Sequence, residues 1–431
     1  MIENVEFFHI FFISSMSCIS IQKWYNILRH VKFQQEEKEL KMPLFYQQLD
    51  RNSKYVLKCC FFVFAVNGLY AMILGSLLPL MSMEYGLNNT VSGALLSAHQ
   101  AGNLIAGFIA GVLPIYLGRK KSILFLCSFV IMGFSLMIIT GNPVLLILGF
   151  LFTGLSRGSI SNFNNTVVNE VSGSSLAALN ILHSIFAIGA LSAPFLVIAS
   201  THIAGDIGWK VACGVIIVLA AISMILFSRM RIDDTVKRKE STSYVFLKSK
   251  NFIIVAGIIF FYLCIESAVN GWIVKYFVDS GILTTKYAQM LASLLWVVML
   301  AGRLTCAFIG DRVSKGTLLI TTSVGTVIFY LLLLSTQNVW IITLAIMGLG
   351  YSMAGIYPTT IATFGNTIKE YPMSIGVLLM LGGTGSIIMP VIIGALSDQF
   401  GILVGMTAIV FAIVMMTIFV LANVFALRSD K

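Results

Sequence analysis

Long apolar segments recur along almost the whole chain, and they constrain its fold more than any other feature. A transmembrane helix needs about 20 mainly apolar residues, and twelve segments from residue 57 onward have about this length. A helix satisfies its own backbone hydrogen bonds inside a bilayer. We therefore predict an all-α membrane protein with twelve transmembrane helices, at residues 57–82, 92–117, 122–140, 143–168, 175–200, 209–229, 252–277, 287–309, 316–336, 339–365, 372–396 and 401–426.

The composition leaves too little polar surface for a water-soluble protein of this size. Hydrophobic residues make up 58% of the 431 residues and charged residues only 11%, whereas soluble domains average about 25% charged residues. The formal net charge is +10, but the basic residues lie between apolar segments, so they indicate membrane topology and we expect no nucleic-acid partner. The seven cysteines show no ligand spacing, and we expect them to pack as small hydrophobic side chains.

Lysine and arginine concentrate in alternate loops, which predicts the orientation of the helices. Basic residues gather at 119–121, 229–250 and 312–315 and at Lys369, whereas the intervening loops carry little beyond Lys210 and Lys286. Because basic loops stay on the cytoplasmic side, we expect a multi-pass protein of the cell membrane with both termini in the cytoplasm. The longest loop, residues 230–251, is then a cytoplasmic linker.

An internal repeat divides the chain into two halves. One shift of 196 residues aligns Gly75 with Gly271, Gly154 with Gly350, Gly189 with Gly385, Pro194 with Pro390, and Arg119 with Lys315. Matches in a single register indicate two parallel six-helix bundles. We assign these bundles to residues 57–229 and to 252–431, which includes a short tail. Residues 1–56 form a cytoplasmic extension, and we expect the natural start near Met42.

Two charged residues interrupt the apolar segments near the predicted bilayer midplane. Glu266 and Arg157 fall at about the same depth in their segments. A charge at the bilayer centre costs about 2.5–3.5 kcal/mol on insertion scales, so such residues usually face a cavity or a partner. We predict that Glu266 handles a coupling ion or a substrate hydroxyl, and that Arg157 is its partner or holds a substrate anion. A fixed ion pair that only packs the halves together is the alternative.

Further polar and aromatic residues are candidates for a substrate cavity. Ser161, Asn162 and Asn165 follow Arg157 near one helix face, although interhelical hydrogen bonding would also explain them. The aromatic candidates could stack on a sugar ring, or they could serve as packing and interfacial anchors. The remaining candidates are Asn67, Tyr70, Gln100, Asn103, Asn270, Trp272, Trp296 and Tyr357.

The loop after the second segment carries Gly111, Gly118, Arg119 and Lys120. It resembles a loop of the major facilitator superfamily in which a small residue, an acid and a Gly-Arg-Lys group form a charge–dipole latch. Ile115 stands at the position of the acid. The corresponding loop of the second half keeps the acid as Asp311. We expect this loop, with Asp311, Arg312 and Lys315, to act together with Arg303 as a gate or latch. Basic residues beside a tight turn are the alternative.

Segments spread over residues 57–426 resemble the fucose-permease-like (FHS) group of that superfamily. They are Ala178 to His183, Glu266 with Gly271 and Trp272, Trp296 with Gly302 and Arg303, Tyr357 with Pro358, and Gly382, Gly383 and Gly385 with Pro390. The resemblance implies a twelve-helix secondary transporter, often for sugars, coupled to protons or sodium. Ser161, four residues before Asn165, stands where that group has a proton-handling acid, which puts that group's proton route in doubt here.

We therefore predict a secondary active transporter for a small polar solute, either a sugar or an organic anion. It would work as a monomer in the lipid bilayer by alternating access, coupled to H⁺ or Na⁺. The sequence has no nucleotide-binding P-loop, and we expect no cofactor, no metal and no enzymatic activity. Efflux of drugs or metabolites by the same fold and a non-transporting, permease-like sensor are the alternatives.

Overall fold

The computed structural model describes residues 46, 49–173, 175–232, 245–309, 312–371 and 374–429. The chain divides into two compact units, Met1–Leu49 and Asp50–Lys431. All the described helices that follow belong to the second unit. Residues 1–45, which hold most of the predicted extension and its expected start near Met42, lie outside the described residues.

The second unit is helical throughout its described residues, and no strand occurs among them. The α-helices are α4 (Arg51–Tyr85), α5 (Asn89–Leu117), α6 (Arg119–Ile139), α7 (Pro143–Val171), α8 (Leu176–Ala204), α9 (Gly208–Arg229), α10 (Lys250–Asp279), α11 (Thr285–Ile309), α12 (Lys315–Leu334), α13 (Val339–Met353), α14 (Ile356–Thr363), α15 (Gly365–Glu370), α16 (Ser374–Phe400) and α17 (Ile402–Ser429). Two short 3-10 helices, η1 (Gly205–Ile207) and η2 (Val245–Lys248), precede α9 and α10.

Short polar residues and glycines set the helix ends. Asp50 caps α4 by accepting a hydrogen bond from the Ser53 backbone N–H at 3.1 Å, and Asn142 caps α7 just ahead of Pro143. These side chains satisfy backbone donors that have no partner inside the helix. Gly118 has a φ of 77°, a conformation that glycine adopts without steric cost, and it separates α5 from α6.

Each of the twelve predicted apolar segments overlaps a described helix. Ten stretches of the described residues are long and apolar enough to cross a membrane, and one of them, Ile181–Arg229, takes in α8 and α9 together. The segment predicted at 339–365 is not a single helix, because α13 ends at Met353 and α14 begins at Ile356. Pro358 follows closely, and a proline clashes with the carbonyl group four residues before it.

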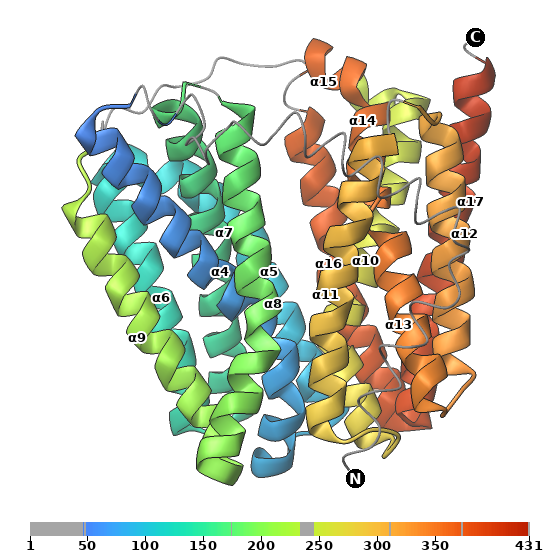
Figure 1. Cartoon of the computed structure of the whole chain (residues 1–431), viewed down its shortest axis with the longest axis horizontal. Coiled ribbons are helices and arrows are strands. Elements are labelled where there is room, and N and C mark those ends of the chain that lie inside the picture. Colours follow the sequence, from blue (N-terminus) through green and yellow to red (C-terminus); the bar gives the residue numbers. More distant parts are fainter. Residues whose placement is uncertain are drawn as a thin grey trace, which may run out of the picture. The chain divides into compact units, whose positions relative to one another are not determined.

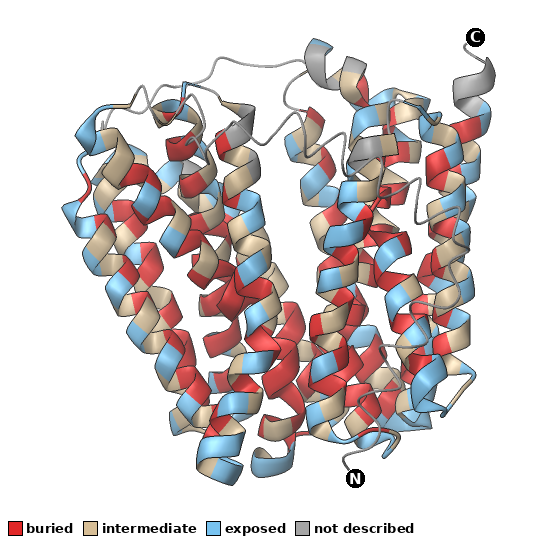
Figure 2. Cartoon of the chain, in the orientation of Figure 1, coloured by how far each residue is buried: buried red, intermediate tan, exposed pale blue. Residues whose placement is uncertain are grey.

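The helices gather in two groups, with α4 to α9 on the left of Figure 1 and α10 to α17 on the right. We call the end of the helices that carries Arg119, Arg229 and Lys315 the basic end, and the end that carries Asn89 and Asp398 the opposite end. Buried residues line the faces that helices turn toward one another (Figure 2). In each group the core therefore lies between the helices.

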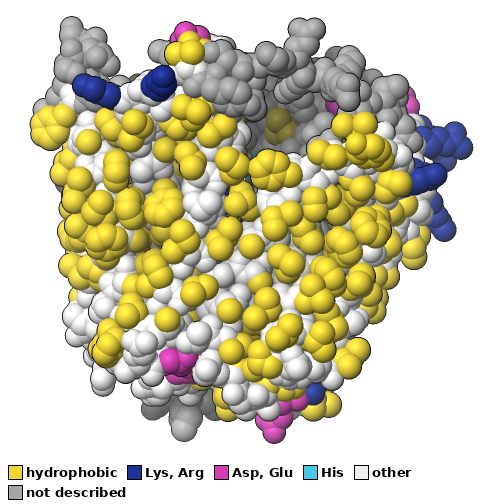
Figure 3. Space-filling view, turned by 180° about the vertical axis from the view of Figure 1, so that it is seen from behind, with side chains coloured by type: hydrophobic (Ala, Val, Ile, Leu, Met, Phe, Trp, Pro, Cys, Tyr) yellow, Lys and Arg dark blue, Asp and Glu magenta, His cyan; other side chains and the backbone are white. Residues whose placement is uncertain are grey.

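The outer faces of the helices are strongly apolar. Large side chains such as Phe125 and Phe411 are exposed, and hydrophobic side chains cover most of the face shown in Figure 3, while the charged side chains seen there gather toward the two ends. Exposed apolar surface of this extent marks a membrane or partner contact. The described cysteines carry no disulfide, and five of the six are buried.

The two groups approach each other most closely through glycines. A Cβ atom on Gly75 of α4 would collide with the carbonyl oxygen of Asn270 in α10, and one on Gly93 of α5 would collide with that of Pro390 in α16. Glycine has no Cβ, so α4 packs on α10 and α5 packs on α16 backbone to backbone. These contacts join the two groups toward the opposite end, and the cavity between the groups opens toward the basic end.

Candidate functional site

A cavity of about 1790 Å³ lies between the two helix groups. Residues of α4, α5, α6, α7 and α8 line it from one group, and residues of α10, α11, α14 and α16 line it from the other. It reaches Pro114, Arg119 and Glu170 at the basic end. Its lining on α5 starts at Leu96 and on α16 stops at Pro390, so the opposite end of both helices lies outside it.

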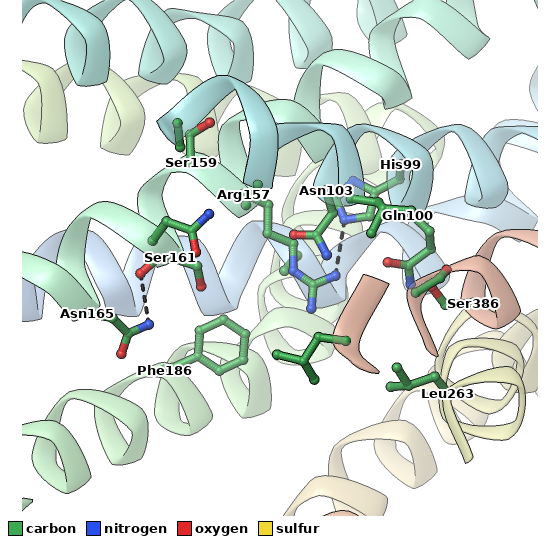
Figure 4. A pocket seen from close by; sticks show the side chains of 18 of the residues that line it. His99, Gln100, Asn103, Arg157, Ser159, Ser161, Asn165, Phe186, Leu263 and Ser386 are labelled. Atoms are coloured by element: carbon green, nitrogen blue, oxygen red, sulfur yellow. Dashed lines mark hydrogen bonds between the residues drawn. The ribbon is translucent and has the colours of Figure 1, made fainter. Parts of the chain in front are cut away.

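Arg157 of α7 extends into this cavity, where Figure 4 shows it beside His99. Its Nη1 atom lies 3.4 Å from Nε2 of His99, and Nδ1 of His99 lies 2.9 Å from the Thr153 hydroxyl oxygen. The Thr153 hydroxyl donates to the Phe150 carbonyl oxygen at 2.7 Å. Arginine has only donors, so His99 must be neutral, accepting at Nε2 and donating from Nδ1 to Thr153. This chain of hydrogen bonds orients the guanidinium group.

The partners of Arg157 leave its charge without a carboxylate. The ion pairs of the described residues are Arg119–Glu170, Lys210–Glu84 and Lys275–Asp279, and none of them involves Arg157. Asn67 donates to the backbone carbonyl oxygen of Arg157 at 3.4 Å, which leaves the guanidinium group to the cavity. An ion pair between Arg157 and Glu266, one of the predicted alternatives, is therefore not formed in this structure.

Glu266 of α10 faces the same cavity from the other helix group. Its Oε1 atom accepts a hydrogen bond of 3.1 Å from the hydroxyl of Tyr262, one helical turn earlier. Tyr262 is buried, and its ring centroid lies 6.0 Å from that of Tyr357. Glu266 forms none of the ion pairs found among the described residues. An acid and a cation thus face one cavity from opposite halves of the chain without contact.

Most of the predicted cavity residues line it. They are Gln100, Asn103, Ser161, Asn162, Asn165, Asn270, Trp296 and Tyr357, together with Arg157 and Glu266. Three predicted residues are absent from the lining. Asn67 and Trp272 are fully buried, and Tyr70 packs edge-on against Phe134 at 6.3 Å between ring centroids. Their positions follow from helix rotation, since these faces of α4 and α10 turn toward neighbouring helices.

The described residues of the predicted latch lie at or near the basic end of the helices. Arg119 pairs with Glu170 at 2.8 Å, which joins the start of α6 to the end of α7. Lys315 donates to the carbonyl oxygen of Ala362 at 2.8 Å. Lys120 is half-buried and Arg312 exposed, and Gly111 lies near the end of α5. Asp311 lies outside the described residues. Arg303 lines the cavity and lies 3.8 Å from the sulfur of Met299.

The opposite end is closed by polar contacts between the groups. Both carboxylate oxygens of Asp398 in α16 accept backbone N–H groups at the start of α5, from Asn89 at 2.8 Å and from Thr90 at 2.7 Å. Nearer the cavity, the hydroxyl of Ser97 donates to the Ile387 carbonyl oxygen at 2.5 Å. An acid at a helix N-terminus meets unsatisfied donors and the positive end of the helix dipole.

Sequence reasoning assigned no such roles to Tyr262, Thr153 and Asp398. Thr153 had no local signal, because its partner His99 lies 54 positions away in the sequence, whereas Tyr262 precedes Glu266 by four positions, a spacing that brings side chains together on a helix. That signal was available. Asp398 had no local signal, because its partners lie 309 and 308 positions away in the sequence. No group of three potential metal ligands occurs among the described residues.

A polar cavity between two helix groups of a membrane protein is typical of solute transporters. The chain belongs to the Major Facilitator Superfamily, whose model matches residues 60–367. It is 20% identical over 344 residues to an uncharacterised MFS-type transporter of Yersinia pestis, which covers 78% of this chain and 87% of that protein. It is also 29% identical over 119 residues to a gallate transporter of Pseudomonas putida, over 27% of this chain and 26% of that protein.

Solved structures show the same fold. A bacterial homologue of the human lysosomal transporter Spinster, in an inward-facing and unoccupied conformation, superposes with a TM-score of 0.71 at 12% identity, over 89% of this chain and 99% of that chain. The nucleoside transporter NupG superposes with a TM-score of 0.68 at 14% identity, over 87% of this chain and 98% of that chain. At these identities the likeness concerns the fold alone.

Proposed function

We propose that this protein is a secondary active transporter that moves a small polar solute, a sugar or an organic anion, by alternating access. The observation that carries the proposal is the central cavity, which both helix groups line with polar and charged side chains and which opens at one end only. In this scheme twelve spans form two bundles, residues 57–229 and 252–431, that rock about the cavity. In this scheme the basic end faces the cytoplasm and the cavity is open to the inside of the cell.

Glu266 is the proposed coupling residue, with H⁺ or Na⁺ as the driving ion. Its support is its place in the cavity lining, held by Tyr262 from its own helix. The proposed assignment to the fucose-permease-like group rests on the sequence resemblance. Ser161, at the position of that group's acid, does line the cavity, which is compatible with coupling through Glu266 instead. The gate is proposed at the basic end, around Arg119, Arg303 and Lys315.

An organic anion is the solute class favoured by two observations. Arg157 presents an uncompensated cation to the cavity, and a stretch of the chain is similar to a gallate transporter. The proposal of a sugar as the solute rests on the sequence resemblance alone. Efflux by the same fold uses the same cavity and differs only in direction. A non-transporting sensor predicts binding without flux.

Flux into proteoliposomes tests the proposal. The full chain is reconstituted, and uptake of radiolabelled solutes, including glucose, gluconate and benzoate, is followed with an imposed pH gradient or sodium gradient. We expect gradient-dependent accumulation of at least one solute, absent from liposomes without protein. Binding without gradient-dependent flux of any solute would favour the sensor.

A further inference from the structure

We infer that the substrate is a small organic anion whose carboxylate binds Arg157, and that each anion travels with one proton carried by Glu266. This inference rests on the proposed transport function and narrows both its solute and its coupling ion. It follows from the depth of the charges in the cavity, from the way Arg157 is held, and from the charge balance of a closed carrier.

The guanidinium group of Arg157 is held by neutral partners. The hydrogen bonds from His99 through Thr153 to the Phe150 carbonyl oxygen fix its direction but supply no negative charge. Phe186 and Leu263 line the same cavity (Figure 4), so part of its wall is apolar. Arg157 is half-buried in the open cavity, and its charge requires compensation once closure of the cavity excludes water. Arginine matches the two oxygens of a carboxylate with parallel donors. A neutral sugar would leave the charge uncompensated.

Arg157 and Glu266 share a depth that no other charged residue of the lining shares. Arg157 lies 14 residues before α7 ends at Val171, and Glu266 lies 16 residues after α10 begins at Lys250. At 1.5 Å per residue these positions are about 21 and 24 Å from the basic end along their helices. Arg303 is only 6 residues from the end of α11 at Ile309, or about 9 Å, and it is exposed at the mouth.

The deep part of the cavity therefore contains one positive and one negative side chain. An empty carrier can close around this neutral set. Adding an anion makes the set negative, which is costly once water is excluded. A proton on Glu266 restores neutrality, since the substrate carboxylate then compensates Arg157 while the protonated acid carries no charge. Anion and proton binding thus favour each other, and linkage makes this coupling reciprocal.

Other groups around Glu266 do not replace it as the proton carrier. His99 is committed as a neutral acceptor toward Arg157. The faces that α4 and α16 turn to the cavity carry no titratable side chain among their lining residues. The other titratable or charged side chains of the lining are Arg157 of α7, His183 of α8, Arg303 of α11 and Tyr357 of α14, and Tyr262 of α10 donates a hydrogen bond to Glu266. Arg119 and Glu170 also line the cavity, but they pair with each other at the basic end.

Ligand binding to the purified full-length transporter tests the inference. Benzoate, gluconate, acetate and lactate are compared with benzyl alcohol and glucose by thermal unfolding and by equilibrium binding between pH 5 and 8. We expect at least one carboxylate to bind while the neutral compounds do not. Its dissociation constant should rise with pH, by up to about tenfold per pH unit, because one proton is bound with each anion.

Two variants separate the roles. Arg157→Lys keeps a charge but loses the paired donors, and it should weaken carboxylate binding at least about tenfold. Glu266→Gln mimics the protonated acid, so it should bind the carboxylate with an affinity that no longer depends on pH. Arg231→Gln, an exposed arginine after α9, is the matched charge control. Circular dichroism and gel filtration confirm that each variant is folded.

The inference fails if no carboxylate binds, if glucose binds in their place, or if carboxylate binding to the wild type is independent of pH. These results differ from a failure of the transport function. Gradient-driven flux of glucose without carboxylate binding would support the transport function and overturn the proposal that the substrate is an anion. Carboxylate binding without any gradient-dependent flux would keep the anion site and overturn transport.

Discussion

At the scale of single residues, the orientation of Arg157 decides what the cavity can hold. Its guanidinium group is positioned by His99, which is itself positioned by Thr153. Neither neighbour needs to touch the solute, so we describe both as positioning residues. Their loss should weaken binding while the charge of the cavity stays the same.

Replacing His99 tests this positioning. A hydrogen bond to a charged group contributes about 1.5–3 kcal/mol, so His99→Phe should raise the carboxylate dissociation constant roughly tenfold to a hundredfold. The pH dependence should persist, because Glu266 is unchanged. Thr153→Val removes only the second hydrogen bond, and a smaller effect is expected. Equal binding by His99→Phe and wild type would refute the positioning role.

The sequence shows charges and depth but not which way a side chain turns. Arg157 and Glu266 could be predicted to face a cavity, because an apolar bilayer makes any other placement costly. Tyr70 and Trp272 could not be excluded from it in the same way, because aromatic side chains pack equally well between helices. The contact of Arg157 with His99 joins two helices 58 positions apart, and no local pattern predicts it.

At the scale of helices, α5 and α16 close the opposite end of the cavity. Asp398 holds the first backbone N–H groups of α5, and Gly394 packs its backbone on the Asn89 carbonyl group. Alternating access requires these contacts to separate when the opposite end opens. Asp398 therefore stabilises one of the two states and not the other.

Removing this charge should shift the population of states. An acid at an exposed helix N-terminus contributes about 0.3–1 kcal/mol, so Asp398→Asn should favour the state open at the opposite end by roughly twofold to fivefold. Spin labels at Met83 and Phe400, both exposed near that end, would report the change as a larger share of long distances. Asp206→Asn, an exposed acid at the same end, is the control. An unchanged distance distribution would contradict the closing role of Asp398.

Helix positions were the most predictable part of the fold. Apolar length and the short polar caps mark them, as at Asn142 and Pro143 before α7. The break between α13 and α14 was missed because the run at 339–365 carries no charged residue and is mainly apolar, and only Gly355 and Pro358 signal the interruption. No local pattern predicts the pairing of α5 with α16, since it depends on contacts far apart in the sequence.

At the scale of the whole transporter, the proposed cycle links the two deep charges to the movement of the two helix groups. Arg157 belongs to the first half of the repeat and Glu266 to the second. With the cavity empty, their opposite charges balance each other. With an anion and a proton bound, the anion compensates the charge of Arg157 and the proton neutralises Glu266. The net charge of the deep part of the cavity is therefore zero both in the empty carrier and in the carrier with anion and proton bound. It is negative when the anion binds without the proton.

The most direct test of this account is transport by Glu266→Gln in proteoliposomes, with the carboxylate that binds best. The wild type should accumulate the anion when the outside is acidic. The variant should lose accumulation and still exchange internal for external anion, because it behaves as permanently protonated. Glu370→Gln, an exposed acid at the end of α15, should behave like the wild type. Undiminished proton-driven accumulation by Glu266→Gln would contradict the account.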